Sequence, residues 1–406
     1  MKKQTIGSKI LAFNISPPDG GTPLDFSLQT NGIKYYEDVT DTSVHLSIGI
    51  LDVRGRYNKL PVRSGNKMMI EIESNGRVLK QEMKISNISS YVASAKREMY
   101  EITCEKQSAF DNHTSRIRKK YTGNISDNIK DIVEEMGGEM VRFHPSSNTY
   151  SFVGGYRRPL FACTWLARKC VHGDMSDTKG SAGFLFFQDQ DGFNLIDIDK
   201  SFEDANKDNV PNYEYKIGKS TLDPDNYFTL SAQPTLETNH NVLQQLSVGH
   251  FRTANWYYDI TRREIKYKEY SYRDSDGNLK KSADERVIPK GIDENYSRIL
   301  LQTVDNGALS SDGEVKSKSE ESYFRQAQAT TRYSSLFSQV TKIIVPVNLN
   351  LKAGMVIYLK LPEINNTRTD GPQSGLYLIS KLCHQFGGDK DYTGLELVRD
   401  SYQELS

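Results

Sequence analysis

The sequence has 406 residues, and its 52 Lys plus Arg balance its 52 Asp plus Glu, so the formal net charge is zero. That balance excludes a global basic field for nucleic acid and an acidic excess for a basic partner, and leaves only local charged patches open. No run of about 18 apolar residues is present, which excludes a membrane-spanning helix. The four scattered cysteines indicate a reducing compartment rather than a disulfide framework. They are Cys104, Cys163, Cys170 and Cys383.

Residues 1–110 are predicted to form a β domain. Apolar side chains alternate with small or polar ones along one strand, which indicates one buried face. These apolar residues are Val44, Leu46, Ile48 and Ile50. Another strand is predicted over 68–72, after a turn at Gly65, and Asn75-Gly76 is a strong signal for a two-residue hairpin turn.

Residues 111–215 are predicted to mix helices and strands. The clearest helix is "NISDNIKDIVEEMGG", with Ser126 as its N-cap and Gly137-Gly138 as its stop. Its apolar residues at helical spacing are Ile125, Ile129, Ile132, Val133 and Met136.

A second helix is predicted in "RPLFACTWLARKCVHGD", followed by a hairpin in "GFLFFQDQDGFNLIDID". Asp191-Gly192 is predicted to form the type I′ turn of that hairpin. The expected buried side of the helix is Phe161, Trp165, Leu166 and Cys170.

Residues 216–406 return mainly to strands. Strands are predicted in "LQQLSVGHF", "NWYYDIT" and "EIKYKEYSYRD", then a linker over 305–322 and a helix over 323–340. Four further strands are predicted after residue 340. We interpret 216–250 and 323–406 as one discontinuous β domain, interrupted by a β-rich insertion at 251–322.

Two segments far apart in the sequence follow the same order. "VRSG" at 62–65 precedes a strand, a loop, a strand containing Ile85-Ser86, a polar turn and a third strand. "LKAG" at 351–354 precedes the same series, with Ile379-Ser380 at the matching place and a longer loop. Unrelated antiparallel hairpins can share alternating apolar residues, but agreement over three strands and two connections favours an internal duplication. Such a duplication suggests two copies placed side by side in a ring.

The sequence resembles the baseplate hub subunit of contractile-tail phages. The resemblance is carried by "LKAGMVIYLKL…SGLYLISKLCHQF…YTGLELVRDSY", by "FACTWLARKC…GFLFFQDQDGFNLIDIDKSF", by the N-terminal copy and by the length. The resemblance is shared with the hub part of contractile secretion spikes.

The resemblance implies an α+β, mainly β fold. It has two duplicated tail-tube-like β-sandwich or barrel domains, a helix-plus-hairpin domain between them, and an inserted β-rich domain. The domains expected are 1–110 (tube-like), 111–215 (α+β), 216–250 with 323–406 (tube-like) and 251–322 (inserted). A homotrimer then forms a pseudo-sixfold ring that connects the tail tube to the central spike.

The resemblance also implies partners and a location. The partners are the tail tube or a tube-initiator protein, a spike protein that carries any peptidoglycan-cleaving activity, and other baseplate proteins. Genomic DNA passes through the ring without specific binding. The expected location is the virion tail, after assembly in the host cytoplasm.

We find no enzyme motif, cofactor motif or metal motif that predicts a catalytic, cofactor-binding or metal site. Cys163, Cys170 and His172 do not have a usual zinc spacing, and the expected arrangement is two buried thiols and a surface histidine. "DQDG" at 189–192 and "DSDG" at 274–277 lack the ligand spacing of a calcium loop and are interpreted as hairpin turns.

Three charged groups have functional alternatives. Glu134-Glu135 and Glu320-Glu321 could supply the carboxylates of a glycosidase, but adjacent carboxylates on a helix point apart, so solvated helix faces are expected. The basic run from Arg116 to Lys120 could contact DNA, but without interleaved aromatic residues a solvated linker is favoured.

The leading hypothesis is therefore a structural hub protein that is not an enzyme. One alternative is a tail-associated peptidoglycan hydrolase with β binding domains. Another is the hub of a contractile secretion or bacteriocin particle, whose spike usually continues into a long β-helix. The end of the sequence at Ser406 favours a phage-type hub with a separate spike.

Overall fold

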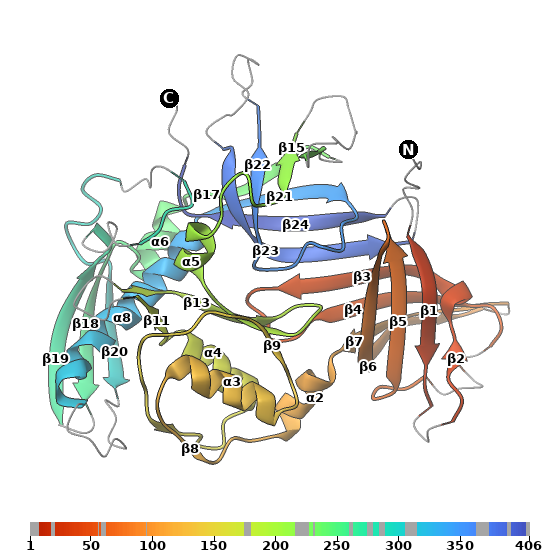
Figure 1. Cartoon of the computed structure of the whole chain (residues 1–406), viewed down its shortest axis with the longest axis horizontal. Coiled ribbons are helices and arrows are strands. Elements are labelled where there is room, and N and C mark those ends of the chain that lie inside the picture. The colour runs from red at the N-terminus through yellow and green to blue at the C-terminus, as the bar shows by residue number, and fades with distance from the viewer. Residues whose placement is uncertain are drawn as a thin grey trace.

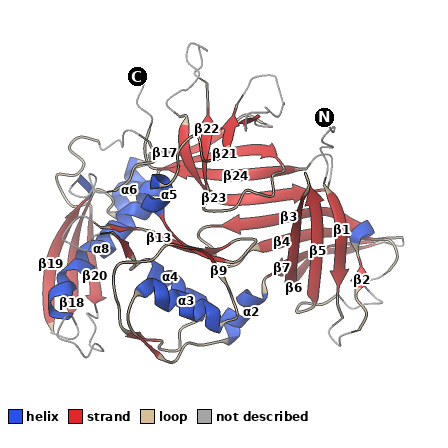
Figure 2. Cartoon of the chain, viewed as in Figure 1, coloured by secondary structure: helices blue, strands red, loops and turns tan. Residues whose placement is uncertain are grey.

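The chain is an α+β protein in which strands dominate, as the sequence predicts (Figures 1 and 2). The computed structural model describes residues 8–17, 21–55, 57, 62–94, 96–173, 180–215, 227–229, 232–259, 263–273, 279–283, 289–304, 315–362, 373–387 and 391–402. The "DSDG" segment at 274–277 lies outside these residues. None of the helices in this part of the chain is long and apolar enough to cross a membrane.

The N-terminal β unit, residues 9–105, is built from strands with one buried face. Its elements are β1 (Lys9–Ile15), β2 (Leu24–Asp25), η1 (Ser27–Gln29), β3 (Thr30–Asp38), β4 (His45–Asp52), β5 (Lys67–Ser74), β6 (Arg77–Ala93) and β7 (Glu98–Glu105). In β4 the predicted alternation is confirmed, because Leu46, Ile48 and Ile50 are buried and the residues between them are not. Asn75 and Gly76 join β5 to β6 with φ of 52° and 76°, as a type I′ turn requires.

The middle domain follows, with helices packed on a small sheet. Its helices are α2 (Gln107–Thr114), α3 (Ile125–Glu135), α4 (Pro159–Ala167) and α5 (Ile198–Glu203). Its strands are β8 (Lys120–Tyr121), β9 (Met140–Phe143), β10 (Phe152–Val153), β11 (Val171–His172), β12 (Ser181–Ala182), β13 (Phe184–Gln188) and β14 (Phe193–Asp197). Apolar residues of α3, α4, β13 and β14 share one buried cluster.

Three local predictions in the middle domain are wrong. The cap of α3 is Asn124, whose side chain accepts the Ser126 N–H, so Ser126 is inside the helix. Phe161 on α4 is 60% exposed, because this helix is apolar on nearly every side and periodicity does not identify its buried face. Cys170 is buried as predicted, but it lies beyond the end of the helix.

The turn between β13 and β14 also differs from the prediction. The Asp189 N–H donates to the Gly192 carbonyl, so Gln190 and Asp191 are the central residues. No residue from 189 to 192 has a positive φ, which excludes a type I′ turn. The Asp189 side chain instead accepts the N–H groups of Asp191 and Gly192 and stabilises the turn.

The C-terminal β unit, which spans 212–239 and 339–399 in two stretches, joins the N-terminal β unit in a single sheet of 14 strands. Its strands are β15 (Asn212–Glu214), β16 (Tyr227–Thr229), β17 (Thr235–Asn239), β21 (Gln339–Pro346), β22 (Val356–Lys360), β23 (Gly375–Phe386) and β24 (Tyr392–Arg399). Strands β23 and β24 run beside β3 and β4 in Figure 1. Ile379 and Leu395 are buried in one apolar cluster that extends through both β units.

Among the described residues between β17 and β21, a three-stranded sheet has one helix before it and another after it in the chain. Its elements are α6 (Val242–Val248), β18 (Arg252–Asp259), β19 (Glu264–Ser271), β20 (Arg298–Val304) and α8 (Val315–Leu336). The strand predicted in "LQQLSVGHF" is wrong, because Asn241 caps a helix there and Gly249 ends it with φ of 77°. The predicted linker over 305–322 is wrong from Val315 onward, where α8 begins.

Candidate assembly surface and interdomain joint

Each β unit contains a backbone junction, and the two junctions match at the segments that the sequence comparison aligns. The Gly65 N–H donates to the Ile85 carbonyl at 2.7 Å, and the Gly354 N–H donates to the Ile379 carbonyl at 2.8 Å. Both glycines have positive φ, of 94° and 73°, which other residues rarely adopt. In each unit the isoleucine N–H then returns a hydrogen bond to the residue after the glycine.

The serine after each isoleucine also occupies matching surroundings. The strand register shifts at Ser86 between β6 and β7, and at Ser380 between β23 and β24. The Ser86 hydroxyl donates to the Thr103 carbonyl at 3.1 Å, and the Ser380 hydroxyl donates to the Glu396 carbonyl at 3.0 Å. A bulge of this kind bends a strand and increases its twist. The same bend therefore occurs at the same point of both units.

The β units are joined directly by the antiparallel ladder between β23 and β3. It runs from Lys381 opposite Asp38 to Phe386 opposite Ile33. Within it, the His384 ring stacks on Tyr35 with 6.1 Å between ring centroids, and its Nδ1 lies 2.8 Å from the Thr393 hydroxyl. Burial lowers the pKa of His384 to about 3, so this ring is neutral at physiological pH.

The β13–β14 loop of the middle domain also contacts both β units where they meet, at what we call the joint. The Gln190 N–H donates to Glu37 on β3 at 2.7 Å, and the Gln190 side chain donates to the Leu349 carbonyl at 3.2 Å. The Gln81 side chain on β6 donates to the Gln190 carbonyl at 3.2 Å. Asp191 forms an ion pair with Lys352. The "DQDG" motif is thus a structural connector between all three parts.

Glu37 is the buried polar centre of this joint. Its carboxylate accepts the Tyr35 hydroxyl at 2.9 Å and the Ala353 N–H at 2.8 Å, besides the Gln190 N–H. Burial, and the nearby Asp189 carboxylate, raise the pKa of Glu37 to about 7. The three donors compensate part of the desolvation cost of this carboxylate. Sequence reasoning missed Glu37. Alternation along β3 places this residue on the buried face, but nothing near it in the sequence indicates which groups would pair with a buried carboxylate.

A second buried polar cluster fixes helix α8. The Arg332 guanidinium is fully buried and donates to Asp199 at 2.6 Å and to Asp400 at 2.7 Å. Asp400 also accepts the backbone N–H and hydroxyl of Ser282. The cluster therefore ties α8 to the middle domain, to the end of β24 and to the inserted segment. No sequence motif signals it, because its members are far apart in the chain.

The residues considered for chemistry are distributed differently. Cys163 and Cys170 are buried free thiols whose pKa values burial raises, while His172 is half-buried with its Nδ1 3.9 Å from Asp197. In the described part of the chain, no group of three or more His, Cys, Asp or Glu could hold a metal ion. Glu134 is exposed on α3, 3.8 Å from Lys130. Glu320 and Glu321 lie on α8, where their side chains are outside the described residues.

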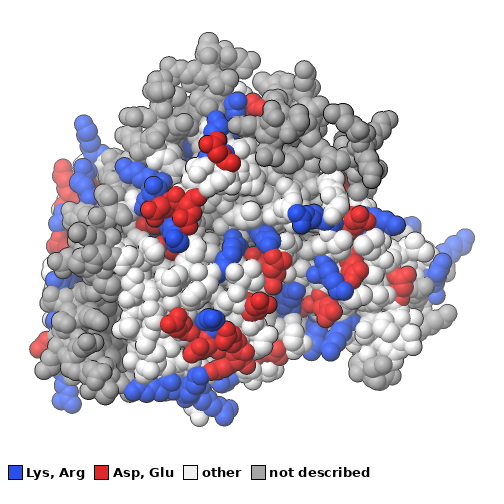
Figure 3. Space-filling view, in the orientation of Figure 1, with Lys and Arg blue, Asp and Glu red and all other residues white. Residues whose placement is uncertain are grey.

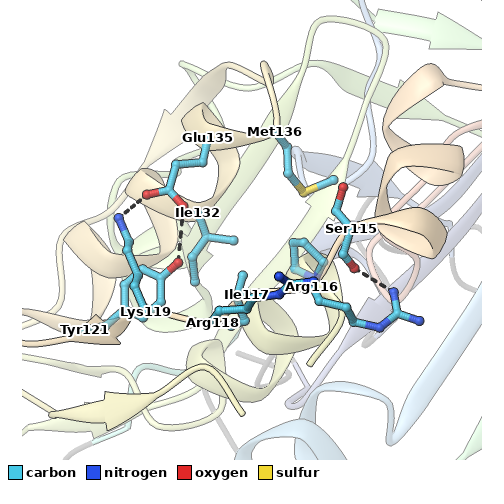
Figure 4. Close-up of a pocket in the computed structure, with 10 residues that line it drawn as sticks. Ser115, Arg116, Ile117, Arg118, Lys119, Tyr121, Ile132, Glu135 and Met136 are labelled. Atoms are coloured by element: carbon cyan, nitrogen blue, oxygen red, sulfur yellow. Dashed lines mark hydrogen bonds and ion pairs between the residues drawn. The ribbon is translucent and has the colours of Figure 1, made fainter. Parts of the chain in front are cut away.

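The basic run lines a small pocket with a volume of about 280 Å³ between the start of the middle domain and α3 (Figure 4). Figure 4 shows Lys119 and Tyr121 converging on Glu135, and the Arg116 guanidinium bonded to the Ser115 carbonyl. Ile117 within the run is buried. The run is therefore part of the middle domain rather than a solvated linker between domains: Lys120 begins β8, and Lys119 binds Glu135 of α3.

The face of the molecule in Figure 3 carries charges of both signs, interspersed over the described atoms rather than gathered into one basic area. On the sheet shared by the β units, Lys381 lies 3.7 Å from Asp38 and 3.6 Å from Glu396. A surface of alternating sign gives little non-specific attraction for nucleic acid.

Exposed apolar side chains gather on the inserted sheet. Trp256 on β18 lies opposite Tyr267 on β19 and Leu301 on β20, so the three share one face. Six apolar residues of that face are between 38% and 79% exposed: Trp256, Tyr258, Ile265, Tyr267, Ile299 and Leu301. Contiguous exposed apolar surface of this kind is typical of protein–protein contact sites.

Scans of the sequence against protein-family models and against curated proteins found no match. Among solved structures, the chain is similar to the 43 kDa tail protein of prophage MuSo2 from Shewanella oneidensis. The two are 10% identical with a TM-score of 0.54, over 97% of this chain and 98% of that chain. The tail protein from Neisseria meningitidis MC58 is also 10% identical, with a TM-score of 0.55 over 97% of each chain.

These likenesses extend over nearly the whole of each chain. The protein therefore has the fold of phage-type tail proteins, and the resemblance found in the sequence is confirmed at the level of the fold.

Proposed function

We propose that the protein is a structural hub subunit of a phage tail baseplate, and that three copies form a ring between the tail tube and the central spike. The observation that carries the proposal is the matching junction at Gly65–Ile85 and at Gly354–Ile379. Two units with the same strand junction and bulge are the expected product of an internal duplication. Three such chains then supply six similar units, which suits contact with a sixfold tube and a threefold spike.

The joint between the units supports a mechanical role. A ring that transmits force needs its two units held at a fixed angle. The β23–β3 ladder, the buried Glu37 and the loop at Gln190 supply such a connection. Main-chain ladders and buried hydrogen bonds open only with large parts of the core, because their loss leaves buried polar groups unpaired.

The partners that we propose are a second and third copy of the chain, the tail tube or a tube-initiator protein, the spike and other baseplate proteins. The exposed apolar face of the inserted sheet suits one of these contacts. Genomic DNA would pass through the ring without specific binding. The expected site of action is the virion tail, with assembly in the host cytoplasm.

We also propose that the chain has no catalytic role, so that any cleavage of peptidoglycan belongs to a partner. A zymogram on peptidoglycan tests this directly. Cleared zones that disappear with one carboxylate substitution would favour the hydrolase alternative. A hub of a secretion or bacteriocin particle would behave as the phage hub does in this assay.

The mass of the purified protein, alone and mixed with tube and spike partners, tests the ring itself. The proposal predicts a species of three times the chain mass. A strict monomer in the presence of both partners would contradict it.

A further inference from the structure

Two segments of the middle domain contain basic residues and no acidic ones. Residues 112–126 carry four Lys or Arg, residues 140–173 carry five, and neither segment contains Asp or Glu. Over the whole chain the acidic and basic residues are equal in number, so these segments concentrate positive charge. One of the cations, Arg142, is used at the joint, where it binds Asp189.

The fold brings the two segments together as antiparallel neighbours. Lys120 lies opposite Val153 in the short β8–β10 pair. Before β8, the Ile117 N–H donates to the Arg157 carbonyl at 3.0 Å. The basic run at 116–120 therefore lies beside the cations of the second segment, and their positive charges add on one side of the domain.

Aromatic rings, rather than carboxylates, hold several of these cations in place. The Arg118 guanidinium lies 5.3 Å from the centre of the Tyr156 ring, and that of Arg157 lies 4.7 Å from the Trp165 ring. Within the described part of the chain, neither Arg116 nor Arg118 forms an ion pair with a carboxylate. A cation–π contact orients a guanidinium without neutralising it, so both charges are available to an anionic partner.

The pocket in Figure 4 lies directly beside these cations and has apolar walls. Ile117 and Ile132 belong to the buried apolar cluster of the middle domain, and Met136 packs against that cluster. Arg116 and Arg118 also line the pocket. Its volume of about 280 Å³ is below the roughly 300–1,000 Å³ typical of small-molecule sites, and it suits one apolar side chain.

We propose that this pocket is a docking site for an acidic segment of a partner protein. One apolar side chain of that segment enters the pocket, and Asp or Glu residues on either side of it bind Arg116 and Arg118. Guanidinium groups bind carboxylates with two parallel hydrogen bonds, and arginine clusters commonly recognise acidic motifs. The site lies within a single chain, so it goes beyond the proposed ring and does not depend on it.

Nucleic acid fits this surface less well than an acidic peptide. Proteins that hold single strands stack the bases on free aromatic rings. Here the Trp165 ring already contacts Arg157, and the Tyr156 ring already contacts Arg118. The Glu135 carboxylate also lines the pocket, where it would face the phosphates of a bound strand.

Fluorescence anisotropy with a dye-labelled peptide tests the site in the full chain. The probe is a leucine with three glutamates on each side. One control peptide has serine in place of the leucine, and another has glutamine in place of every glutamate. We expect the probe to bind at least about tenfold more tightly than either control peptide. Its affinity should fall severalfold as salt rises from about 0.05 to about 0.3 M, because the salt screens exposed charges.

Variants of the protein separate the charges from the pocket. Arg116→Ala/Arg118→Ala should weaken binding of the probe at least about tenfold. The matched control is Lys96→Ala/Arg97→Ala, which removes two exposed cations of the β6–β7 turn and should leave the affinity unchanged. Ser115 is exposed at the edge of the pocket, so Ser115→Trp should block it without disturbing the core. This variant should bind the leucine and serine peptides equally.

Equal affinities of the two double variants for the probe would overturn the docking site, and so would equal binding of the leucine and serine peptides by the unsubstituted protein. Tighter binding of a short DNA duplex than of the probe, lost in the variant without Arg116 and Arg118, would assign the surface to nucleic acid and overturn the proposal. A strict monomer that binds the probe as expected would contradict the proposed ring and leave the docking site intact.

Discussion

The Glu37 carboxylate accepts the Ala353 backbone N–H at 2.8 Å across 316 residues of sequence. Ala353 belongs to the "LKAG" segment of the C-terminal β unit, and Glu37 lies on β3 of the N-terminal β unit. The same carboxylate binds the Gln190 N–H of the middle domain. One buried side chain therefore links the N-terminal β unit, the middle domain and the C-terminal β unit, whose relative orientation the proposed ring subunit would have to hold.

The ionisation of Glu37 should make stability depend on pH. Its pKa is about 7 in the folded chain against a usual 4.5, so the folded state retains a proton that the unfolded state has released. The contribution of Glu37 to the free energy of unfolding is therefore greatest below about pH 4.5, and it is lost as pH rises to about 7. The expected loss is about 1.4 kcal/mol per pH unit within this window.

The variant Glu37→Gln isolates this effect, because glutamine does not titrate. Urea unfolding at several pH values should show that the stability of the original protein, relative to the variant, falls between pH 4.5 and 7. A difference that stays constant over this range would contradict the assignment. Asp197 and His384 also have shifted pKa values, raised and lowered by burial. Both proteins contain these groups, so their effects on stability cancel in the comparison.

The two junction glycines should differ in their tolerance of a side chain. A Cβ at Gly354 would lie 2.5 Å from the Phe187 ring and 3.0 Å from Ile196, whereas a Cβ at Gly65 meets nothing within 4 Å. Gly65→Ala should cost about 1–2 kcal/mol through the positive φ alone. Gly354→Ala should cost more, because the ring must also move. Equal losses in chemical denaturation would show that Gly354 has space that the structure does not provide.

Helix α8 should depend strongly on Arg332. Replacing it with Met leaves Asp199 and Asp400 buried without their cation, and the expected cost is about 3–5 kcal/mol. The matched control is Lys342→Met, which breaks half-exposed ion pairs with Glu237 and Glu396 and should cost about 0–1 kcal/mol. Unfolding midpoints in urea compare the two variants. If Arg332→Met is no more destabilising than Lys342→Met, the buried cluster does not stabilise the helix.

Ile379 combines a buried side chain with the junction backbone. It is fully buried, and Ile379→Asp would place an unpaired charge in the apolar cluster shared by both β units. We expect this variant to be insoluble or unfolded, as judged by gel filtration and circular dichroism. Lys381→Ala, two residues further along the same strand with its side chain half exposed, should remain folded. A soluble, trimeric Ile379→Asp protein would contradict the strand assignment.

Local chemistry made much of the fold predictable from sequence. Leu46, Ile48 and Ile50 fix their strand by strict alternation, and Asn75-Gly76 fixes its turn because both residues tolerate positive φ. The errors occur where two local structures compete. In "LQQLSVGHF" the apolar spacing suits either a strand or a helix, and the cap at Asn241 together with Gly249 decides for the helix.

The joint itself could be predicted only in part. The repeated "Ile-Ser" and glycine positions indicated an internal duplication, and the structure gives both positions the same backbone hydrogen bonds. The partners of Glu37, Gln190 and Arg332 lie in other parts of the chain, so no local pattern reveals them. Asp191-Gly192 suggested a turn of the wrong type, because the Asp189 side chain stabilises a turn one residue earlier.

The most direct test of the account is an electron-microscope image of the purified protein. The account predicts a ring of three subunits with a central hole and six similar lobes around it. Particles of single-chain size, or open filaments without a closed ring, in the presence of the tube and spike partners would contradict it.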